Sequence, residues 1–155
     1  MRPAKKATRL YLERVALWYL ERHAGCEAQL RRVLRKRVWR SFAEHAEPTR
    51  EEGEQAIEEV VGKLRGLGYI DDERFASSRA KTLRRQGKST RAIRSKLRQL
   101  GVDSAAIDQA SEGDDLEAAR TYVRKRRLVG GKKDLAKLAR AGFSYDVAKR
   151  ALEAE

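Results

Sequence analysis

Clusters of lysine and arginine are the residues whose type and spacing could do chemistry in this sequence. Nine cations and no carboxylate occur between Arg79 and Arg98, and six cations without a carboxylate occur in each of the segments 31–40 and 124–133. Guanidinium and ammonium groups bind phosphates and carboxylates through charge-assisted hydrogen bonds. Such runs of cations indicate a surface that binds a polyanion.

Helical spacing places these cations on common faces. Residues 81, 84, 85 and 88 recur at i, i+3, i+4 and i+7, and residues 91, 94 and 98 follow the same rule on the next segment. Like charges at this spacing destabilise an isolated helix, so their repetition favours an anionic partner over a merely solvated face. The candidate binding residues are Arg31, Arg32, Arg35, Lys36, Lys81, Arg84, Arg85, Lys88, Arg91, Arg94, Arg98, Arg124 and Arg127.

Three kinds of anionic partner fit this pattern: a nucleic acid, an acidic protein surface or a membrane. The membrane is the weakest of the three, because no segment sets bulky apolar residues opposite a basic face. No helix carries a base-reading set of Asn, Gln and Arg, so contact with backbone phosphates is the conservative prediction. Trp18 and Trp39 are candidates for stacking on bases. Trp18 flanks an apolar stripe and is expected partly in the core, whereas the exposure of Trp39 stays open.

Other chemistries lack the residues that they need. His23, Cys26 and His45 cannot supply a closed zinc site without carboxylates, so no metal is expected. No nucleotide-binding loop or nucleophile elbow occurs, and Gly130-Gly131-Lys132-Lys133 is interpreted as a turn because no strand precedes it. The doublets at 71–72 and 114–115 (both Asp-Asp) stand where helices begin and are interpreted as caps. We therefore expect neither an enzyme nor a cofactor.

The composition sets the class of protein. The 155 residues include 36 Lys and Arg against 23 Asp and Glu, for a net charge of +13. No apolar run approaches the roughly 20 residues needed to span a bilayer, and the basic N-terminal segment lacks the apolar block of a signal peptide. A single cysteine excludes an internal disulfide, so a reducing cytoplasm is the expected compartment. A monomer is expected, because no heptad pattern indicates a coiled coil.

Helical periodicity runs through almost the whole chain, and no segment alternates as a strand would. The expected helices cover approximately residues 8–21, 26–37, 49–67, 72–86, 89–100, 104–110, 114–126, 132–140 and 144–152. Residues 38–48, which end at Pro48, are expected to be irregular.

A short unit recurs at Gly68, Gly101 and Gly142: two small or apolar residues three apart, then glycine, then an apolar residue. This pattern predicts a Schellman turn, in which glycine adopts the left-handed conformation. The chain is therefore expected to be all-α, with tandem three-helix, helix-turn-helix-like repeats that form an elongated, curved body. The expected modules are 1–48 with a divergent loop at 38–48, a central part at 49–112, and a C-terminal three-helix module at 113–155.

The motif around Gly68 resembles a known family. Leu64-x-x-Leu-Gly-Tyr-Ile-Asp-Asp-x-Arg-Phe-Ala76, followed by Gly87-Lys88 and Ile93-x-x-x-Leu-x-x-x-Gly101, is similar to the core signature of the RecX family of recombinase regulators. Segments 16–22 and 142–147 resemble its opening helix and its closing module. The first segment departs from the pattern: Cys26 stands where Ser is usual, His23 where a second Arg is frequent, and Arg37 where Gly is common.

The resemblance implies a non-catalytic regulator, usually an inhibitor, of the RecA recombinase in DNA repair, homologous recombination and the SOS response. It implies as partners the RecA filament and single-stranded DNA, with double-stranded DNA as a further candidate. RecX-like proteins are thought to lie in the groove of the filament and to block its growth or promote its disassembly. From the residues alone, two alternatives stay open: a general nucleic-acid-binding module without a recombinase partner, and an adaptor that grips an acidic protein.

Overall fold

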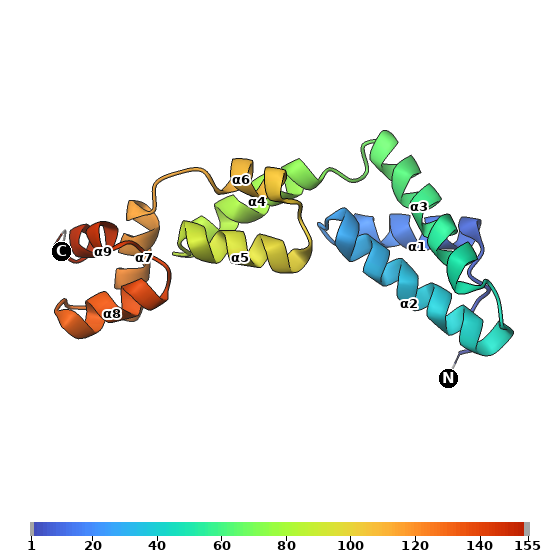
Figure 1. Ribbon diagram of the computed structural model, residues 1–155, viewed down its shortest axis with the longest axis horizontal. Helices are drawn as coiled ribbons and strands as arrows, with labels where there is room; N and C mark the ends of the chain where they lie inside the picture. The colour runs from blue at the N-terminus through green and yellow to red at the C-terminus, as the bar shows by residue number, and fades with distance from the viewer. Residues whose placement is uncertain (1, 154–155) are drawn as a thin grey trace. The chain divides into compact units, whose positions relative to one another are not determined.

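The computed structural model describes residues 2–153, and all the regular secondary structure in that range is helical, as the sequence predicts (Figure 1). The chain divides into two compact units, Met1–Phe75 (unit 1) and Ala76–Glu155 (unit 2). The helices are α1 (Arg9–Arg22), α2 (Glu27–His45), α3 (Arg50–Gly66), α4 (Asp72–Arg85), α5 (Thr90–Leu100), α6 (Ser104–Ser111), α7 (Leu116–Arg126), α8 (Lys132–Arg140) and α9 (Tyr145–Glu153).

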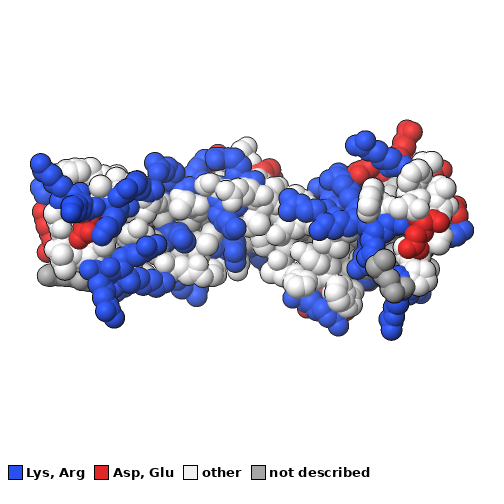
Figure 2. Space-filling model, turned by 90° about the horizontal axis from the view of Figure 1, so that it is seen from below, with Lys and Arg blue, Asp and Glu red and all other residues white. Residues whose placement is uncertain are grey.

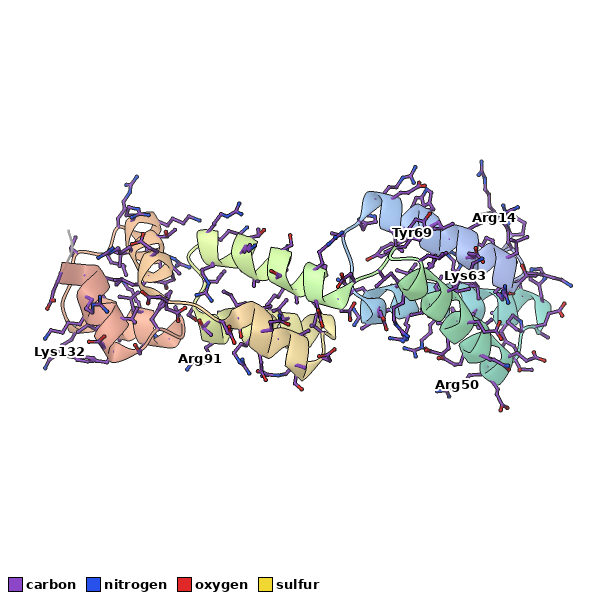
Figure 3. The ribbon with its side chains drawn as sticks, turned by 90° about the horizontal axis from the view of Figure 1, so that it is seen from above. Arg14, Arg50, Lys63, Tyr69, Arg91 and Lys132 are labelled. Carbon is purple, nitrogen blue, oxygen red and sulfur yellow. The ribbon has the colours of Figure 1, made fainter. Side chains whose placement is uncertain are left out.

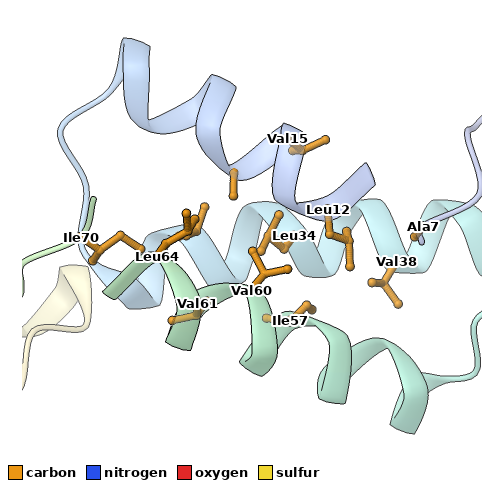
Figure 4. Close-up of a cluster of buried hydrophobic side chains, with 12 residues drawn as sticks. Ala7, Leu12, Val15, Leu34, Val38, Ile57, Val60, Val61, Leu64 and Ile70 are labelled. Carbon is orange, nitrogen blue, oxygen red and sulfur yellow. The ribbon is translucent and has the colours of Figure 1, made fainter. Parts of the chain in front are cut away.

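Unit 1 is built on α1, α2 and α3, which pack against one another around one apolar cluster (Figure 4). Helices α2 and α3 approach each other closely at Gly53, which is buried and where an added Cβ would overlap the side chain of Val38. Full burial of one aliphatic side chain is worth about 1.5–3 kcal/mol, so this cluster dominates the stability of the unit. Its largest fully buried members are Leu12, Leu30, Leu34, Ile57, Val60, Val61 and Leu64.

The prediction that residues 38–48 are irregular is wrong for most of that segment. Helix α2 continues to His45 and ends at Ala46, which adopts a left-handed conformation. The reason is that Val38 and Ser41 extend the buried series of Leu30 and Leu34, and Ser41 is fully buried. The module boundaries at residues 48 and 112 stay predictions.

Unit 2 holds most of α4 and all of α5–α9. Helix α5 packs on α6, while α7 and α8 both pack on α9. The last three helices enclose a second cluster, which includes Leu116, Val123, Leu138 and Phe143. Ser89, at the start of α5, is fully buried and its Oγ donates a hydrogen bond of 2.7 Å to the carbonyl of Ala141. One buried hydroxyl thus ties α5 to the turn between α8 and α9.

The three repeated glycines share one geometry. Gly68, Gly101 and Gly142 have φ of 79°, 89° and 100°. In each case the amide that follows the glycine donates to a carbonyl five residues back, as in Tyr69 to Leu64 at 2.9 Å, which is the defining bond of a Schellman turn. Two further turns have this bond, at Gly87 and at Arg127, and Arg127 is a non-glycine residue with a φ of 51°.

The two aspartate doublets each serve two helices. The first member caps the helix that it precedes: Asp71 accepts from the amide of Arg74 at 3.0 Å, and Asp114 accepts from that of Leu116 at 3.0 Å. The second member accepts from the first amide of another helix. Asp72 accepts from Glu27 of α2 at 2.9 Å, and Asp115 from Thr90 of α5, also at 2.9 Å.

Candidate nucleic-acid and protein interface

The cations that the sequence singles out on α2 fall into two groups. Arg31 binds Glu58 at 2.8 Å and Glu27 at 3.1 Å. Arg35 binds Glu54 through two nitrogens, at 2.7 and 3.0 Å, and this hydrogen bonding lowers the pKa of the Glu54 carboxyl. These two arginines therefore join α2 to the acidic face of α3 and have little charge left for an external anion.

Arg32, Lys36 and Trp39 form an exposed row on α2 at i, i+4 and i+7. Neither cation belongs to a salt bridge with any residue in the range 2–153. The Trp39 side chain is 71% exposed, which settles the question that the sequence leaves open. These three residues line a shallow hollow, so they can meet a phosphate and an aromatic base together.

Arg84 is the predicted site residue whose position differs most from a solvent-facing one. Its guanidinium donates to Asp115 Oδ1 at 2.8 Å and to the Ser111 carbonyl at 2.9 Å, and its side chain is only 22% exposed. Asp115 also accepts from the Thr90 hydroxyl at 2.7 Å. This cluster joins α4, α5, α6 and the start of α7, so Arg84 holds unit 2 together instead of facing a partner.

Arg94 is also engaged within unit 2. It donates to the Asp108 carboxylate at 2.6 Å and to the hydroxyl of the buried Ser111 at 3.0 Å. The other predicted cations of unit 2 are exposed and lie outside the salt bridges found among residues 2–153; they are Lys81, Arg85, Lys88, Arg91, Arg98, Arg124 and Arg127.

The fold brings two of the basic runs of unit 2 together. Gly87, between α4 and α5, packs against the backbone of α7 at Tyr122. Lys125 of α7 donates to the carbonyl of Gln86 at 3.1 Å, and so lies beside the turn that carries Arg85 and Lys88. Figure 2 shows Lys and Arg side chains over both units on the face drawn. Arg91 and Lys132, by contrast, stand at the starts of different helices, α5 and α8 (Figure 3).

Sequence reasoning missed a group of cations that the fold gathers on unit 1. Arg2, Lys5, Arg14, Arg37 and Arg40 line two adjoining hollows between the N-terminal segment, α1 and α2. Their separation along the chain hides them, because they come from three segments. The signal that could have found them is the basic N-terminus, which carries four cations among the first nine residues.

Residues 2–153 hold neither a metal-binding cluster nor a membrane-spanning helix. No group of three or more His, Cys, Asp or Glu side chains there could hold a metal ion. No helix in that range is long and apolar enough to cross a bilayer.

Comparison with known proteins identifies the family. Residues 71–110 match the family model described as RecX, second three-helix domain. The regulatory protein RecX of Myxococcus xanthus (strain DK1622) is 39% identical over an alignment of 165 positions. The alignment covers 96% of this chain and 88% of that protein. The regulatory protein RecX of Xanthomonas campestris pv. campestris (strain B100) is 33% identical, with 91% and 88% covered.

Solved structures support the same fold. The crystal structure of RecX from Lactobacillus salivarius superposes with a TM-score of 0.72 at 23% identity, over 94% of this chain and 95% of that one. A second structure, of a regulatory protein RecX, gives a TM-score of 0.67. On the similarity of sequence along nearly the whole chain, this protein belongs to the RecX family of regulatory proteins.

Proposed function

We propose that this protein binds the RecA recombinase filament on single-stranded DNA and inhibits its recombinase and ATPase activity in DNA repair. The observation that carries the proposal is family membership over nearly the whole chain. The free cations of both units add a physical reason, because a recombinase filament presents the phosphates of its DNA along its length.

The proposal assigns separate tasks to the cations. Those without a carboxylate partner, such as Arg85 and Lys88, would contact the filament or its DNA. Those that bind carboxylates of this chain, such as Arg31 and Arg84, would hold the helices in place. In this proposal the protein acts as a monomer in the cytoplasm, without catalytic activity or a cofactor of its own.

The test is the rate of ATP hydrolysis by RecA on single-stranded DNA, measured with and without this protein. Inhibition at amounts near one molecule per RecA subunit is the expected result. A heat-unfolded sample of the same protein serves as the control for nonspecific depletion of DNA by its positive charge.

Two outcomes would count against the proposal. An unchanged rate, together with no co-sedimentation with the filament, would remove RecA as the partner. Inhibition that disappears when single-stranded DNA is in large excess would favour the alternative, a basic module that competes for DNA without a recombinase partner. Repeating the assay at higher salt separates the two explanations. Inhibition by competition for DNA should weaken steeply with salt, because binding to DNA alone does so.

A further inference from the structure

The cations of unit 1 that sequence reasoning missed line a groove formed by two adjoining hollows. Two hollows of about 230 Å³ each adjoin between the N-terminal segment, α1 and α2, and both are lined by Lys5, Tyr11 and Arg37. Arg14 and Trp18 extend the lining along α1, and Arg14 is labelled on that helix in Figure 3. We name this set of five residues the α1–α2 groove.

The N-terminal segment is held firmly where it forms one wall of the α1–α2 groove. The amide of Ala7 donates to the Oγ of the buried Ser41 at 2.9 Å, and that hydroxyl donates to the carbonyl of Glu47 at 2.7 Å. The amide of Ala4 donates to the Glu44 carboxylate at 2.6 Å. These bonds on either side of Lys5 fix its backbone against the C-terminal half of α2, so the wall is preorganised for a ligand.

The charge of the α1–α2 groove is positive and uncompensated. No carboxylate lines either hollow, and none of its three cations takes part in a salt bridge among residues 2–153. Arg37 is the most telling, because its side chain is half-buried and forms no hydrogen bond with a described residue. A partly desolvated cation without a counter-charge is unfavourable, so an anion that enters the groove gains more there than at an open surface.

Aromatic side chains stand beside these cations. Trp18 is 49% exposed, and the guanidinium of Arg22 lies 4.8 Å from its ring centroid. Tyr11 is half-buried between the two hollows. Cations that follow a phosphate backbone and aromatic rings on which bases stack are the two elements of single-strand binding.

From this arrangement we infer that the α1–α2 groove binds single-stranded DNA, with Lys5 and Arg37 on backbone phosphates and Trp18 stacked on a base. A duplex fits less well, because its bases are stacked inside and cannot reach Trp18. An acidic peptide would satisfy the cations but would leave Trp18 without a flat partner. The inference rests on the proposed function only in that both involve a DNA strand, and it is tested without RecA.

The test uses the fluorescence of Trp18 in the full chain. Trp39→Phe removes the other of the two tryptophans, so the remaining emission reports on the groove. Titration with a 15-nucleotide oligothymidylate is expected to quench this emission. Adding Lys5→Gln and Arg37→Gln is expected to weaken binding about tenfold and to make the log–log salt slope shallower by about 1.4, since each single-strand phosphate contact contributes about 0.7.

The matched control is Arg50→Gln with Arg74→Gln, which removes the same charge from exposed positions of unit 1 outside the groove. Unchanged Trp18 emission when a labelled oligonucleotide is bound would overturn the inference. So would equal losses of affinity in the control and groove variants, or equal quenching by a duplex or by polyglutamate. Because Lys5 is exposed, Lys5→Gln alone keeps the test valid if the Arg37 variant unfolds. Failure to inhibit RecA would leave this result unaffected.

Discussion

Units 1 and 2 use the second aspartate of a doublet in the same way, but the two units pair their arginines differently. Asp72 and Asp115 each accept from the first amide of another helix, α2 and α5. In unit 2 the half-buried Arg84 completes the cluster at Asp115. In unit 1 the arginines of α2 instead pair with carboxylates at the surface of α3, among them Arg31 with Glu58 and Arg35 with Glu54.

The comparison shows that a run of cations in the sequence is not one functional surface. The basic runs 31–40 and 79–98 are each followed by an acidic segment, residues 44–59 in unit 1 and 101–119 in unit 2. The fold brings part of each run onto its acidic segment, which leaves the rest of the run available for an external anion. Only the position of the carboxylates in three dimensions separates the two roles.

The largest expected effect is at the cluster of unit 2. Arg84→Ala leaves Asp115 partly buried without its guanidinium, and we expect a loss of about 3 kcal/mol in the free energy of unfolding of unit 2. Amide hydrogen exchange, which resolves the two units, measures this loss. Its control is the exposed neighbour, Arg85→Ala, with an expected change within about 0.5 kcal/mol. Equal effects at the two positions would contradict the structural role of Arg84.

A second prediction contrasts one turn from each unit. Gly142→Ala in unit 2 is expected to cost about 2–3 kcal/mol, because the residue has a left-handed backbone and its new Cβ would collide with the buried Ser89 hydroxyl. Gly68→Ala in unit 1 has a similar φ but open space around it, so we expect only about 1 kcal/mol. Urea unfolding of the two variants measures the difference, and equal costs would contradict the close approach at Ser89.

The third prediction concerns binding. Arg85→Gln with Lys88→Gln removes two free cations, and we expect the affinity for single-stranded DNA to fall about tenfold, with a shallower salt slope. Arg31→Gln with Arg35→Gln removes the same charge from paired positions and is expected to change affinity less than threefold. Fluorescence anisotropy of a labelled oligonucleotide compares the two pairs. Equal losses would show that net charge alone, and not pairing, controls binding.

The smallest expected effect is the pH dependence at Glu27 in unit 1. Hydrogen bonding from Arg65 lowers the pKa of this carboxyl, so its stabilising contribution is present above the carboxyl's ordinary pKa and is lost as the pH falls through the depressed value. Glu27→Gln is expected to cost about 1 kcal/mol at pH 7 and nothing at a pH below the folded-state pKa. Urea midpoints at several pH values measure this, and a cost that stays constant down to pH 2 would contradict it.

Much of the fold follows from local signals in the sequence. Thr49 and Glu52, three residues apart, form a capping box at the start of α3, and Cys26 with Gln29 forms another at the start of α2. The C-terminal part of α2 could not be predicted, because the exposed Trp39 and Phe42 add apolar residues to its outer face and mask the periodicity of Val38 and Ser41. The pattern of a helix shows which residues are apolar, but not which of two apolar faces finds a partner.

The candidate site was less predictable, because the sequence does not show which residues come into contact in the fold. Asp115 lies 31 residues beyond Arg84, so no local pattern reveals their pairing. The α1–α2 groove joins Lys5 to Arg37 across 32 positions of sequence, and the bonds of Ala4 and Ala7 to α2 bring them together. Cation runs therefore indicate the class of partner, whereas tertiary contacts decide which cations are free.

The bonds from Ala4 and Ala7 to α2 have a practical consequence for anyone who makes this protein. Residues 4–7 occupy fixed positions between Glu44 and Ser41, so a purification tag fused directly ahead of them would crowd the wall that holds Lys5. If the α1–α2 groove binds single-stranded DNA as proposed, protein that carries such a tag is expected to bind it more weakly. A tag behind α9, or one that is cleaved off before assay, avoids this artefact.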